Sequence, residues 1–448
     1  MEPLTIGQSK LLSVRLNPQK WGIVLKSKRL EGSTNYLFLR SDLFSKLLLA
    51  IPFIVVVTLT GLNFPPIIDE TAFHLPFVLR LRESLSNLRY TAQYNITTPP
   101  LPHILINLWG KIFGYSLPAL RSLTAILSYI AILVFFKILK AKKSPVPLET
   151  TLALLFFPYI LLNSFTIYTV NYGLSFGIFA LYFYLKEPRT KKDALFASLF
   201  STLASFSRQF YIAYPAGAIL TEIYTTLKNK TPLKSRLVDI FILGLPILFL
   251  GLLFFAWKGF VSPGIKEHHP LHFSFAHLTF FFVLTGFYFS SSLLMDPPEK
   301  KWFACIIVPI LLLPIFFVFP LRYVHGFELG AGEGIILRIS NILTSHTSQV
   351  VGKGFLAILF LLGSAALTNS LRNFTQEKLF LTFSLFSLVA IELQTPYIWE
   401  RLWTAGVPAM SIIYFSRPKK GLYFLRLWVI ILMMLGGAYT GLKMQHKI

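Results

Sequence analysis

Residues 237–257 read LVDIFILGLPILFLGLLFFAW, with Asp239 as the one charged side chain. About 20 apolar residues in an α-helix cross the hydrocarbon core of a bilayer. Hydrocarbon offers no partner for unpaired backbone groups, so a helix is the structure that fits this stretch. Similar windows recur, and we predict an all-α, polytopic integral membrane protein with about 11–13 spanning helices. The predicted spans lie near residues 44–63, 118–138, 150–167, 171–185, 194–207, 210–226, 237–257, 274–295, 302–320, 354–371, 379–394, 402–416 and 421–441.

The composition of the whole chain supports a membrane protein. Of 448 residues, 54% are hydrophobic and 14% are charged, and the mean hydropathy is +0.63. Soluble globular chains carry about 25% charged residues, so this chain lacks the polar surface to stay in water. The 44 Phe and 19 Tyr residues demand burial and exclude a disordered chain. A single cysteine, Cys305, excludes a disulfide framework, a thiolate zinc site and a redox pair.

Basic residues define the predicted topology. Lys and Arg number 42 against 19 Asp and Glu, which gives a net charge of +23. Basic clusters occupy the N-terminal segment and alternate connectors, and such clusters mark the cytoplasmic side. They lie in residues 1–46, 137–143, 186–192, 228–236, 300–301, 372–378 and 417–420. We attribute the charge to this orientation signal and to membrane lipid headgroups, and we expect no nucleic-acid partner.

This topology divides the chain into three parts. Residues 1–43 form a basic cytoplasmic segment without a secretory cleavage pattern, 44–441 form the transmembrane domain, and 442–448 form a short tail. Residues 64–117 become the first outer loop, which carries the catalytic motif. Within it, residues 100–114 predict a helix that lies in the outer interface without crossing.

The predicted outer loops also concentrate the residues that carry chemistry. These loops are 64–117, 258–273, 321–353 and 395–401, and all 9 His residues fall in them, beside them or in the tail. The connectors on the other side are plain basic segments. Because sites built from loops on a rigid bundle are common, we place the function on the outer face.

Asp69 and Glu70 follow the first predicted helix directly, in the stretch IIDETAFH that ends at His74. Two adjacent acids at a membrane surface are expensive to desolvate, which favours a catalytic role. The alternative is an acidic helix start, with Asp69 capping a helix over residues 70–90 and Glu70 facing its dipole. The two roles are compatible.

A second cluster, TTPPLPH, runs from Thr97 to His103 and includes Thr98. Its prolines force an extended entry and suit the first turn of a helix. It is either part of a site or a stiff junction between a loop and a helix.

The stretch WKGFVSPGIKEHHPLHFSFAH, residues 257–277, places His268 and His269 beside Lys266. We weigh a metal site, a contact to phosphate or sugar, and a plain interfacial loop. Pro270 disrupts regular helical spacing of His ligands, so we predict no metal.

Two arginines each allow two interpretations, as an anchor at the membrane interface or as part of a binding site. Arg208, followed by Gln209, lies at the outer end of a predicted helix, where it either snorkels to the interface or holds a lipid phosphate. Glu400 and Arg401 precede Trp403 and offer the same choice between an interfacial ion pair and a site.

The motifs, taken in order, resemble those of the GT-C glycosyltransferases, and among them the dolichyl-phosphate-glucose α-1,2-glucosyltransferases. The corresponding stretches here are DETAFHLP, ITTPP, Arg208-Gln209, WKGFVSPGIKEHHPLHF and ERLWTAGVP, spread over residues 69–408. Relative to the family pattern, DETAFH has one extra residue before Phe73-His74. On a regular α-helix that insertion turns His74 by roughly 100°.

The resemblance implies a GT-C fold and an inverting transfer of a sugar, glucose in that family, from a polyprenyl or dolichyl phosphate to a lipid-linked glycan. It implies Asp69 as the general base, with Glu70 as the second acid of the motif. Donor phosphate contacts are expected from Arg208, Gln209, Lys266, His268, His269 and Arg401, and substrate contacts from His74, Thr98, His103 and Glu400. No cofactor is expected, because the leaving group is a lipid phosphate rather than a nucleotide diphosphate. The membrane is that of the endoplasmic reticulum in a eukaryote and the inner membrane in a prokaryote.

Three alternatives remain from the residues themselves. A flippase needs polar groups at mid-membrane, and few lie at the predicted helix centres. A ligase or polymerase that uses a lipid diphosphate also needs an outer loop with Arg and His. A non-enzymatic scaffold does not account for the outer-face bias of His and acids.

Overall fold

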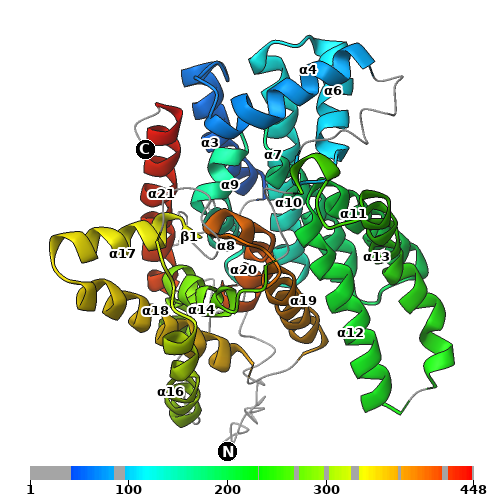
Figure 1. Ribbon diagram of the computed structural model, residues 1–448. Helices are drawn as coiled ribbons and strands as arrows, with labels where there is room; N and C mark the ends of the chain where they lie inside the picture. Colours follow the sequence, from blue (N-terminus) through cyan, green and yellow to red (C-terminus); the bar gives the residue numbers. More distant parts are fainter. Residues whose placement is uncertain are drawn as a thin grey trace, which may run out of the picture. The chain divides into compact units, whose positions relative to one another are not determined.

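The computed structural model describes residues 42–84, 96–230, 232–266, 272–296, 302–323, 332–371, 375–415 and 422–445 (Figure 1). The chain divides into two compact units, residues 1–51 and 52–448. Of the first unit, the described part is the beginning of helix α3 (Asp42–Thr60). The second unit holds every other described element and the whole candidate site.

The described part of the second unit is built almost entirely of helices. After α3, its first half contains η1 (Glu70–His74), α4 (Leu75–Ser84), α6 (Leu101–Phe113), α7 (Leu117–Ala141), α8 (Pro147–Leu155), α9 (Pro158–Asn163), α10 (Thr169–Tyr184), α11 (Lys191–Ser207), η2 (Gln209–Ile212), α12 (Ala213–Lys228), η3 (Leu233–Arg236) and α13 (Leu237–Trp257). Its second half contains η4 (Pro263–Ile265), α14 (Ala276–Phe289), α15 (Ser292–Met295), α16 (Trp302–Val318), α17 (Ile335–His346), α18 (Gln349–Ser370), α19 (Gln376–Glu392), η5 (Glu400–Ala405), α20 (Val407–Phe415) and α21 (Leu422–Met444). The sole strands among the described residues, β1 (Gly332–Glu333) and β2 (Ile398–Trp399), form a two-residue parallel pair.

The all-α, membrane-embedded class predicted from the sequence is confirmed. Five described helices are long and apolar enough to cross a bilayer: α3, α7, α13, α18 and α21. The shorter helices α14 and α16 are also apolar. Except for α14, which is almost wholly buried, these helices carry exposed large hydrophobic side chains, as expected for helices in contact with lipid.

Several predicted segments differ from the structure. The windows 274–295 and 402–416 are each divided, the first into α14 and α15 and the second into η5 and α20. The window 150–167 is two short helices, because α8 ends before Phe156 and Pro158 starts a new helix, α9, at its first turn. The predicted outer loop 321–353 contains helix α17 and the start of α18. The apolar positions of α17 follow a helical period along one face, so a periodicity test on this short segment would have identified it.

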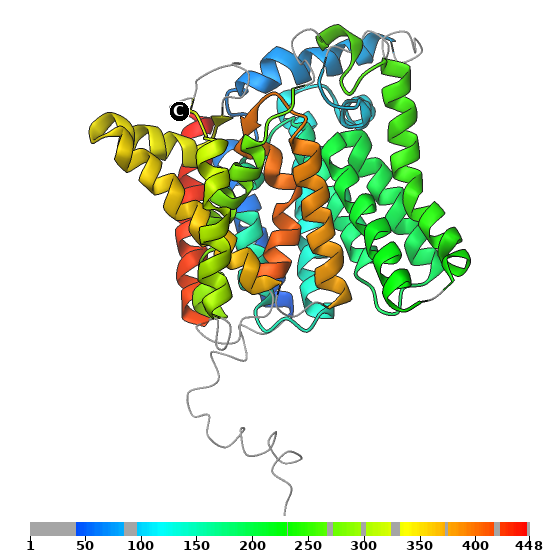
Figure 2. The same ribbon diagram turned by 60° about the horizontal axis from the view of Figure 1, so that its bottom comes forward.

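Close backbone contacts hold the helices of the second half together. A Cβ on Gly286 of α14 would lie 1.8 Å from the Leu359 carbonyl oxygen of α18, and a Cβ on Gly363 would lie 1.9 Å from the Phe282 carbonyl oxygen. Glycines at both positions let α14 and α18 approach closely, as small residues do between membrane helices. In Figures 1 and 2, α14, α16 and α18 form one group, and α10, α11, α12 and α13 form a second.

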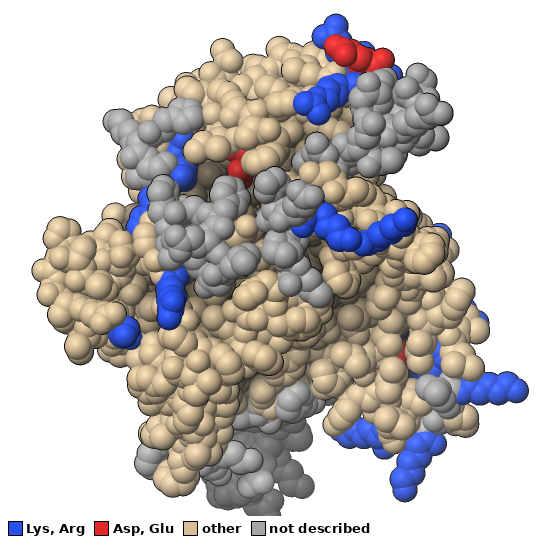
Figure 3. Space-filling model, viewed as in Figure 1, with Lys and Arg blue, Asp and Glu red and all other residues tan. Residues whose placement is uncertain are grey.

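The predicted basic connectors meet at one end of the helices. The Lys142 ammonium lies 3.0 Å from carboxylate oxygens of both Glu187 and Glu377, which joins the connectors 137–143, 186–192 and 372–378. Figure 3 shows Lys and Arg gathered over the lower end of α12, while most of this face is uncharged.

The predicted outer loops meet one another as well. Ser262 donates to the Ile96 carbonyl at 3.0 Å, and Arg401 lies 2.5 Å from Asp69. The helices α4 and α6, which belong to the first of these loops, lie across the ends of the upright helices in Figure 2. Parts of three basic connectors therefore contact one another, and so do parts of the outer loops 64–117, 258–273 and 395–401.

Candidate functional site

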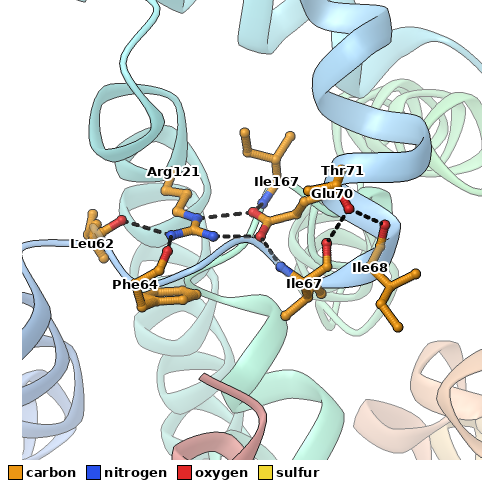
Figure 4. A network of polar contacts seen from close by, with 8 residues as sticks. All are labelled: Leu62, Phe64, Ile67, Ile68, Glu70, Thr71, Arg121 and Ile167. Carbon is orange, nitrogen blue, oxygen red and sulfur yellow. Dashed lines mark hydrogen bonds and ion pairs between the residues drawn. The ribbon is translucent and has the colours of Figure 1, made fainter. Parts of the chain in front are cut away.

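A buried ion pair fixes the loop that carries Asp69 (Figure 4). The guanidinium of Arg121, in α7, reaches both carboxylate oxygens of Glu70, at 3.0 Å to Oε1 and 2.6 Å to Oε2. Both side chains are fully buried. A bidentate pair of this kind adds geometric specificity as well as energy.

The same two side chains bind the backbone on either side. Arg121 donates to the carbonyls of Leu62 (2.9 Å) and Phe64 (2.7 Å), and its guanidinium lies 3.7 Å from the centre of the Phe64 ring. Glu70 accepts from the amides of Ile67 at 3.1 Å and Ile167 at 2.7 Å. With four donors on its carboxylate, Glu70 holds the loop in place and is not positioned to take a substrate proton.

A π-helical turn places His74. The turn η1 spans Glu70–His74, and α4 continues from Leu75. A π turn takes up one extra residue within a helix, which compensates for the insertion in DETAFH, and His74 is buried rather than turned outward. Its Nδ1 lies 2.9 Å from Nε2 of His103, and the two rings stack.

Both imidazoles of this pair are neutral at neutral pH. Burial lowers the pKa of His74 to about 4, and the charges of Arg208 and Arg401 lower it further, against the opposite effect of Asp69. Burial and His74 itself hold the pKa of His103 well below its usual value. The pair is therefore neutral and does not supply a cation for a phosphate.

The Asp69 carboxylate lies against Arg401 and Tyr168. Its side chain makes no capping hydrogen bond to η1, although Asp69 has helical dihedral angles. The predicted cap is therefore wrong for Asp69, whose carboxylate pairs with Arg401 and accepts from the Tyr168 hydroxyl instead. Burial raises the pKa of Asp69, but Arg401, His74 and Tyr168 together hold it below its usual value, so Asp69 is ionised.

Tyr168 connects two arginines. Its ring centre lies 5.6 Å from the guanidinium carbon of Arg401 and 5.8 Å from that of Arg208. Arg401 also lies 4.5 Å over the Trp399 ring. The carboxylate of Asp69 and two guanidinium groups therefore share one aromatic centre.

Arg208 is buried, and one nitrogen of its side chain has no hydrogen-bond partner among the described residues. Arg208 has extended dihedral angles between α11 and η2, so the helix breaks there. Its Nη1 lies 3.2 Å from the Thr169 hydroxyl, whereas its Nε has no hydrogen-bond partner in the described part of the chain. At 7% exposure this arginine does not snorkel to the interface.

Arg208 stands at the wall of a cavity of about 730 Å³. The apolar part of the lining comes from α13 and the end of α19, with residues such as Leu250, Phe254 and Ile391. The polar part includes four predicted site residues, namely Thr98, Arg208, Gln209 and Lys266, together with Thr97, Gln394 and Thr395. Sequence positions more than 100 residues apart are thus brought to one cavity.

The structure describes Lys266 but not the two histidines that follow it. The Lys266 ammonium donates to the Lys258 carbonyl at 2.8 Å and is exposed at the cavity wall. His268 and His269 lie outside the described residues. Within the described ranges, no three His, Cys, Asp or Glu side chains come together as a metal site.

Glu400 connects α14 to the start of α17. It is fully buried, accepts from the Tyr288 hydroxyl and from the Ile336 amide at 3.1 Å, and thereby anchors the start of α17. A Cβ on Gly334 would lie 2.4 Å from its Oε2, so the chain passes directly over the carboxylate. Like Asp69, His74, His103 and Arg401, Glu400 is not among the residues that line the cavity, and its expected substrate contact stays a prediction.

Glu400 predicts a pH-dependent stability. Burial raises its pKa to about 7, above the ordinary value of 4.5, although Tyr288 and Ile336 act in the opposite direction. The folded state then holds a proton that the unfolded state releases, so stability falls as the pH rises from 4.5 towards 7. The full effect is roughly 3 kcal/mol at most. Thermal unfolding in detergent at pH 5, 6, 7 and 8 should show this fall in the wild type and a flatter profile in Glu400→Gln; equal slopes would contradict it.

Sequence reasoning missed two residues of the site. Arg121 is a charged residue within an apolar window, which by itself calls for a buried partner. Tyr168 had no such signal, because it is one of 19 tyrosines and its role depends on the meeting of α10 with the loops of Asp69 and Arg401.

Comparison with known proteins gives one structural similarity. No protein-family model matches the chain, and no curated protein matches it. Among solved structures, the chain is similar to ArnT from Cupriavidus metallidurans in the apo state, with 15% identity, a TM-score of 0.41, and coverage of 90% of this chain and 78% of that one.

Proposed function

We propose that this protein is a membrane glycosyltransferase that uses a polyprenyl-phosphate sugar as its donor. One observation carries the proposal: Asp69 and Arg208 contact the same tyrosine, and Arg208 lies at the polar end of the 730 Å³ cavity. The Asp69 carboxylate, which can accept a proton, is therefore close to the Arg208 guanidinium, which can bind a phosphate at the cavity.

The cavity suits a lipid phosphate. Its volume lies in the range of small-molecule sites, about 300–1,000 Å³, and its apolar wall includes Ile247, Leu250, Gly251 and Phe254 of α13. Because α13 is itself long and apolar enough to span a bilayer, an isoprenoid chain can lie along it. The phosphate then reaches Arg208 and Lys266 at the polar end.

The reaction is a single displacement. Asp69 takes the proton of an acceptor hydroxyl, the hydroxyl oxygen bonds to the anomeric carbon, and the bond from that carbon to the phosphate oxygen breaks. The lipid phosphate leaves with the electron pair and with added negative charge, which the arginines stabilise. The displacement inverts the anomeric centre, and none of its steps requires a redox change.

The pair between Arg401 and Asp69 suits an order of events in this proposal. Arg401 keeps Asp69 a weak base while the site is empty. A donor phosphate beside Arg208 competes for Arg401, which contacts the cavity residue Trp399. Loss of the pair raises the proton affinity of Asp69 at the moment when a donor is bound.

The sugar, acceptor and compartment follow the resemblance. We propose glucose as the sugar and a lipid-linked glycan as the acceptor. The active face is lumenal in the endoplasmic reticulum of a eukaryote or periplasmic at the inner membrane of a prokaryote. The gathering of the predicted outer loops around Asp69 and Arg401 supports one active face.

A transfer assay tests the proposal. Membranes that contain the protein receive radiolabelled dolichyl- or undecaprenyl-phosphate glucose, or the corresponding mannose donors, in separate reactions. We expect label to move to the lipid-linked fraction with one of these donors. Transfer only from a lipid diphosphate sugar would favour a ligase or polymerase, and movement of label across the bilayer without bond formation would favour a flippase.

Arg208→Lys tests the phosphate contact. Lysine keeps the charge but loses the planar fork and its extra donors, so we expect an approximately 10- to 100-fold rise in the donor KM. The acceptor KM should stay near the wild-type value. Arg236→Lys, at an ion pair of η3 with Asp239, is the matched control. Unchanged donor dependence in Arg208→Lys would remove this residue from the phosphate site.

A further inference from the structure

The polar end of the cavity contains acceptors as well as donors. Within the described part of the chain, three buried atoms of the lining residues have no hydrogen-bond partner: Thr98 Oγ1, Arg208 Nε and Gln209 Oε1. Thr98 is 3% exposed and Arg208 is 7% exposed. Because buried polar atoms are nearly always paired, such a group of unpaired atoms around one cavity indicates a polar ligand.

The orientation of the Gln209 amide is fixed. Its Nε2 donates to the Thr97 carbonyl at 3.1 Å. The reverse orientation would place two oxygens against each other, since a carbonyl can only accept. The unpaired atom of Gln209 is therefore the oxygen, and it needs a donor.

The chain around Thr98 is held on both sides. The Ile96 carbonyl accepts from Ser262, the Thr97 carbonyl accepts from Gln209, and the Pro100 carbonyl accepts from the Ile104 amide at 3.1 Å. The free hydroxyl of Thr98 consequently has a defined position. A hydroxyl can both donate and accept.

These atoms call for a ligand with two kinds of polar group. A phosphodiester supplies acceptors for Arg208 Nε but has no hydrogen to donate to Gln209 Oε1, and an isoprenoid chain supplies neither. Sugar hydroxyls donate and accept. We infer that Gln209 and Thr98 form hydrogen bonds with hydroxyl groups of the donor sugar, while Arg208 and Lys266 bind its phosphate.

This inference rests on the proposed function and divides the cavity end into two parts. The phosphate part is common to every polyprenyl phosphate, with or without a sugar. The sugar part acts only on the glycosylated donor. A site built to bond a substrate hydroxyl discriminates against an analogue that lacks it, because its own polar group is then left unpaired.

Binding of two lipids separates the two parts. Purified protein is titrated with undecaprenyl phosphate and with undecaprenyl-phosphate glucose, using the fluorescence of tryptophans, among them Trp399 at the cavity wall. Gln209→Leu should weaken binding of the glucosyl lipid by about three- to tenfold, the usual effect of one lost hydrogen bond. Binding of undecaprenyl phosphate should be unchanged. Thr98→Val should behave in the same way.

The control and the remaining outcomes are distinct. Gln376→Leu makes the same substitution at an exposed glutamine outside this cavity and should leave both affinities unchanged. Equal weakening of both lipids, or of neither, by Gln209→Leu would overturn the sugar-binding role. If the wild type binds neither of these lipids, nor their dolichyl and mannosyl counterparts, the proposed function itself fails.

Deoxy-sugar donors identify the hydroxyl. Wild-type protein should lose affinity for the donor that lacks the hydroxyl bonded to Gln209, and Gln209→Leu should show no further loss with that donor. If the losses of affinity caused by Gln209→Leu and by the missing hydroxyl add in full for every deoxy-sugar donor, Gln209 contacts no sugar hydroxyl.

Discussion

Asp69→Asn should lower the rate of sugar transfer by about 10²–10⁴-fold, the usual contribution of a general base. Asparagine has the same shape and still accepts hydrogen bonds from Arg401 and Tyr168, but its amide cannot take a proton. Since the Asp69 side chain does not cap η1, the substitution leaves the helix start intact. The initial rate of label transfer, at a protein level matched by immunoblot, measures the effect.

The matched control for this substitution is Asp239→Asn, in the first turn of α13 and paired with Arg236. It should leave transfer unchanged. Donor binding by Asp69→Asn should stay the same or become tighter, because a neutral amide holds Arg401 less strongly than the carboxylate does. Normal turnover by a correctly folded Asp69→Asn protein would remove the mechanism.

The fold was predictable because bilayer physics leaves few choices. Apolar windows of the length of residues 237–257 form helices whatever their neighbours, so α13 has the bounds that the sequence predicts. The contacts among basic connectors at Lys142, and among outer loops at Asp69 and Arg401, agree with the charge pattern, and the assignment of these loops to two sides of a membrane stays a prediction. The break between α8 and α9, at Phe156 and Phe157, could not be predicted from hydropathy, because the window 150–167 remains apolar there.

The residue types of the site were easier to predict than their roles. Asp69, Arg208 and Gln209 stand out as polar residues at the ends of apolar helices, and the structure places Arg208 and Gln209 at one cavity. Neighbouring residues in sequence nevertheless diverge: Asp69 faces Arg401, whereas Glu70 turns to Arg121, 51 positions away. Which of the two adjacent acids contacts Arg401 and which contacts Arg121 depends on the π turn and on the position of α7, and neither can be recognised in a motif.

The ion pair of Glu70 and Arg121 gives the second large expected effect. Removing one partner of a buried pair leaves an uncompensated charge and costs about 3–5 kcal/mol. Glu70→Gln and Arg121→Leu should therefore each lower the thermal stability of the purified protein strongly. Transfer should fall as well, because Leu62, Phe64, Ile67 and Ile167 lose the contacts that hold the Asp69 loop.

The double variant Glu70→Leu with Arg121→Leu distinguishes the pair from a general packing defect. It contains no unpaired buried charge, and apolar replacement of a whole buried pair is often tolerated. We expect it to be more stable than Arg121→Leu alone, which leaves the buried Glu70 carboxylate unpaired, yet to stay inactive, because leucine cannot bind the backbone of residues 62–67. Stability losses that simply add in the double variant would mean that the two charges are not coupled. Recovery of transfer together with stability would mean that the position of Asp69 does not depend on this network.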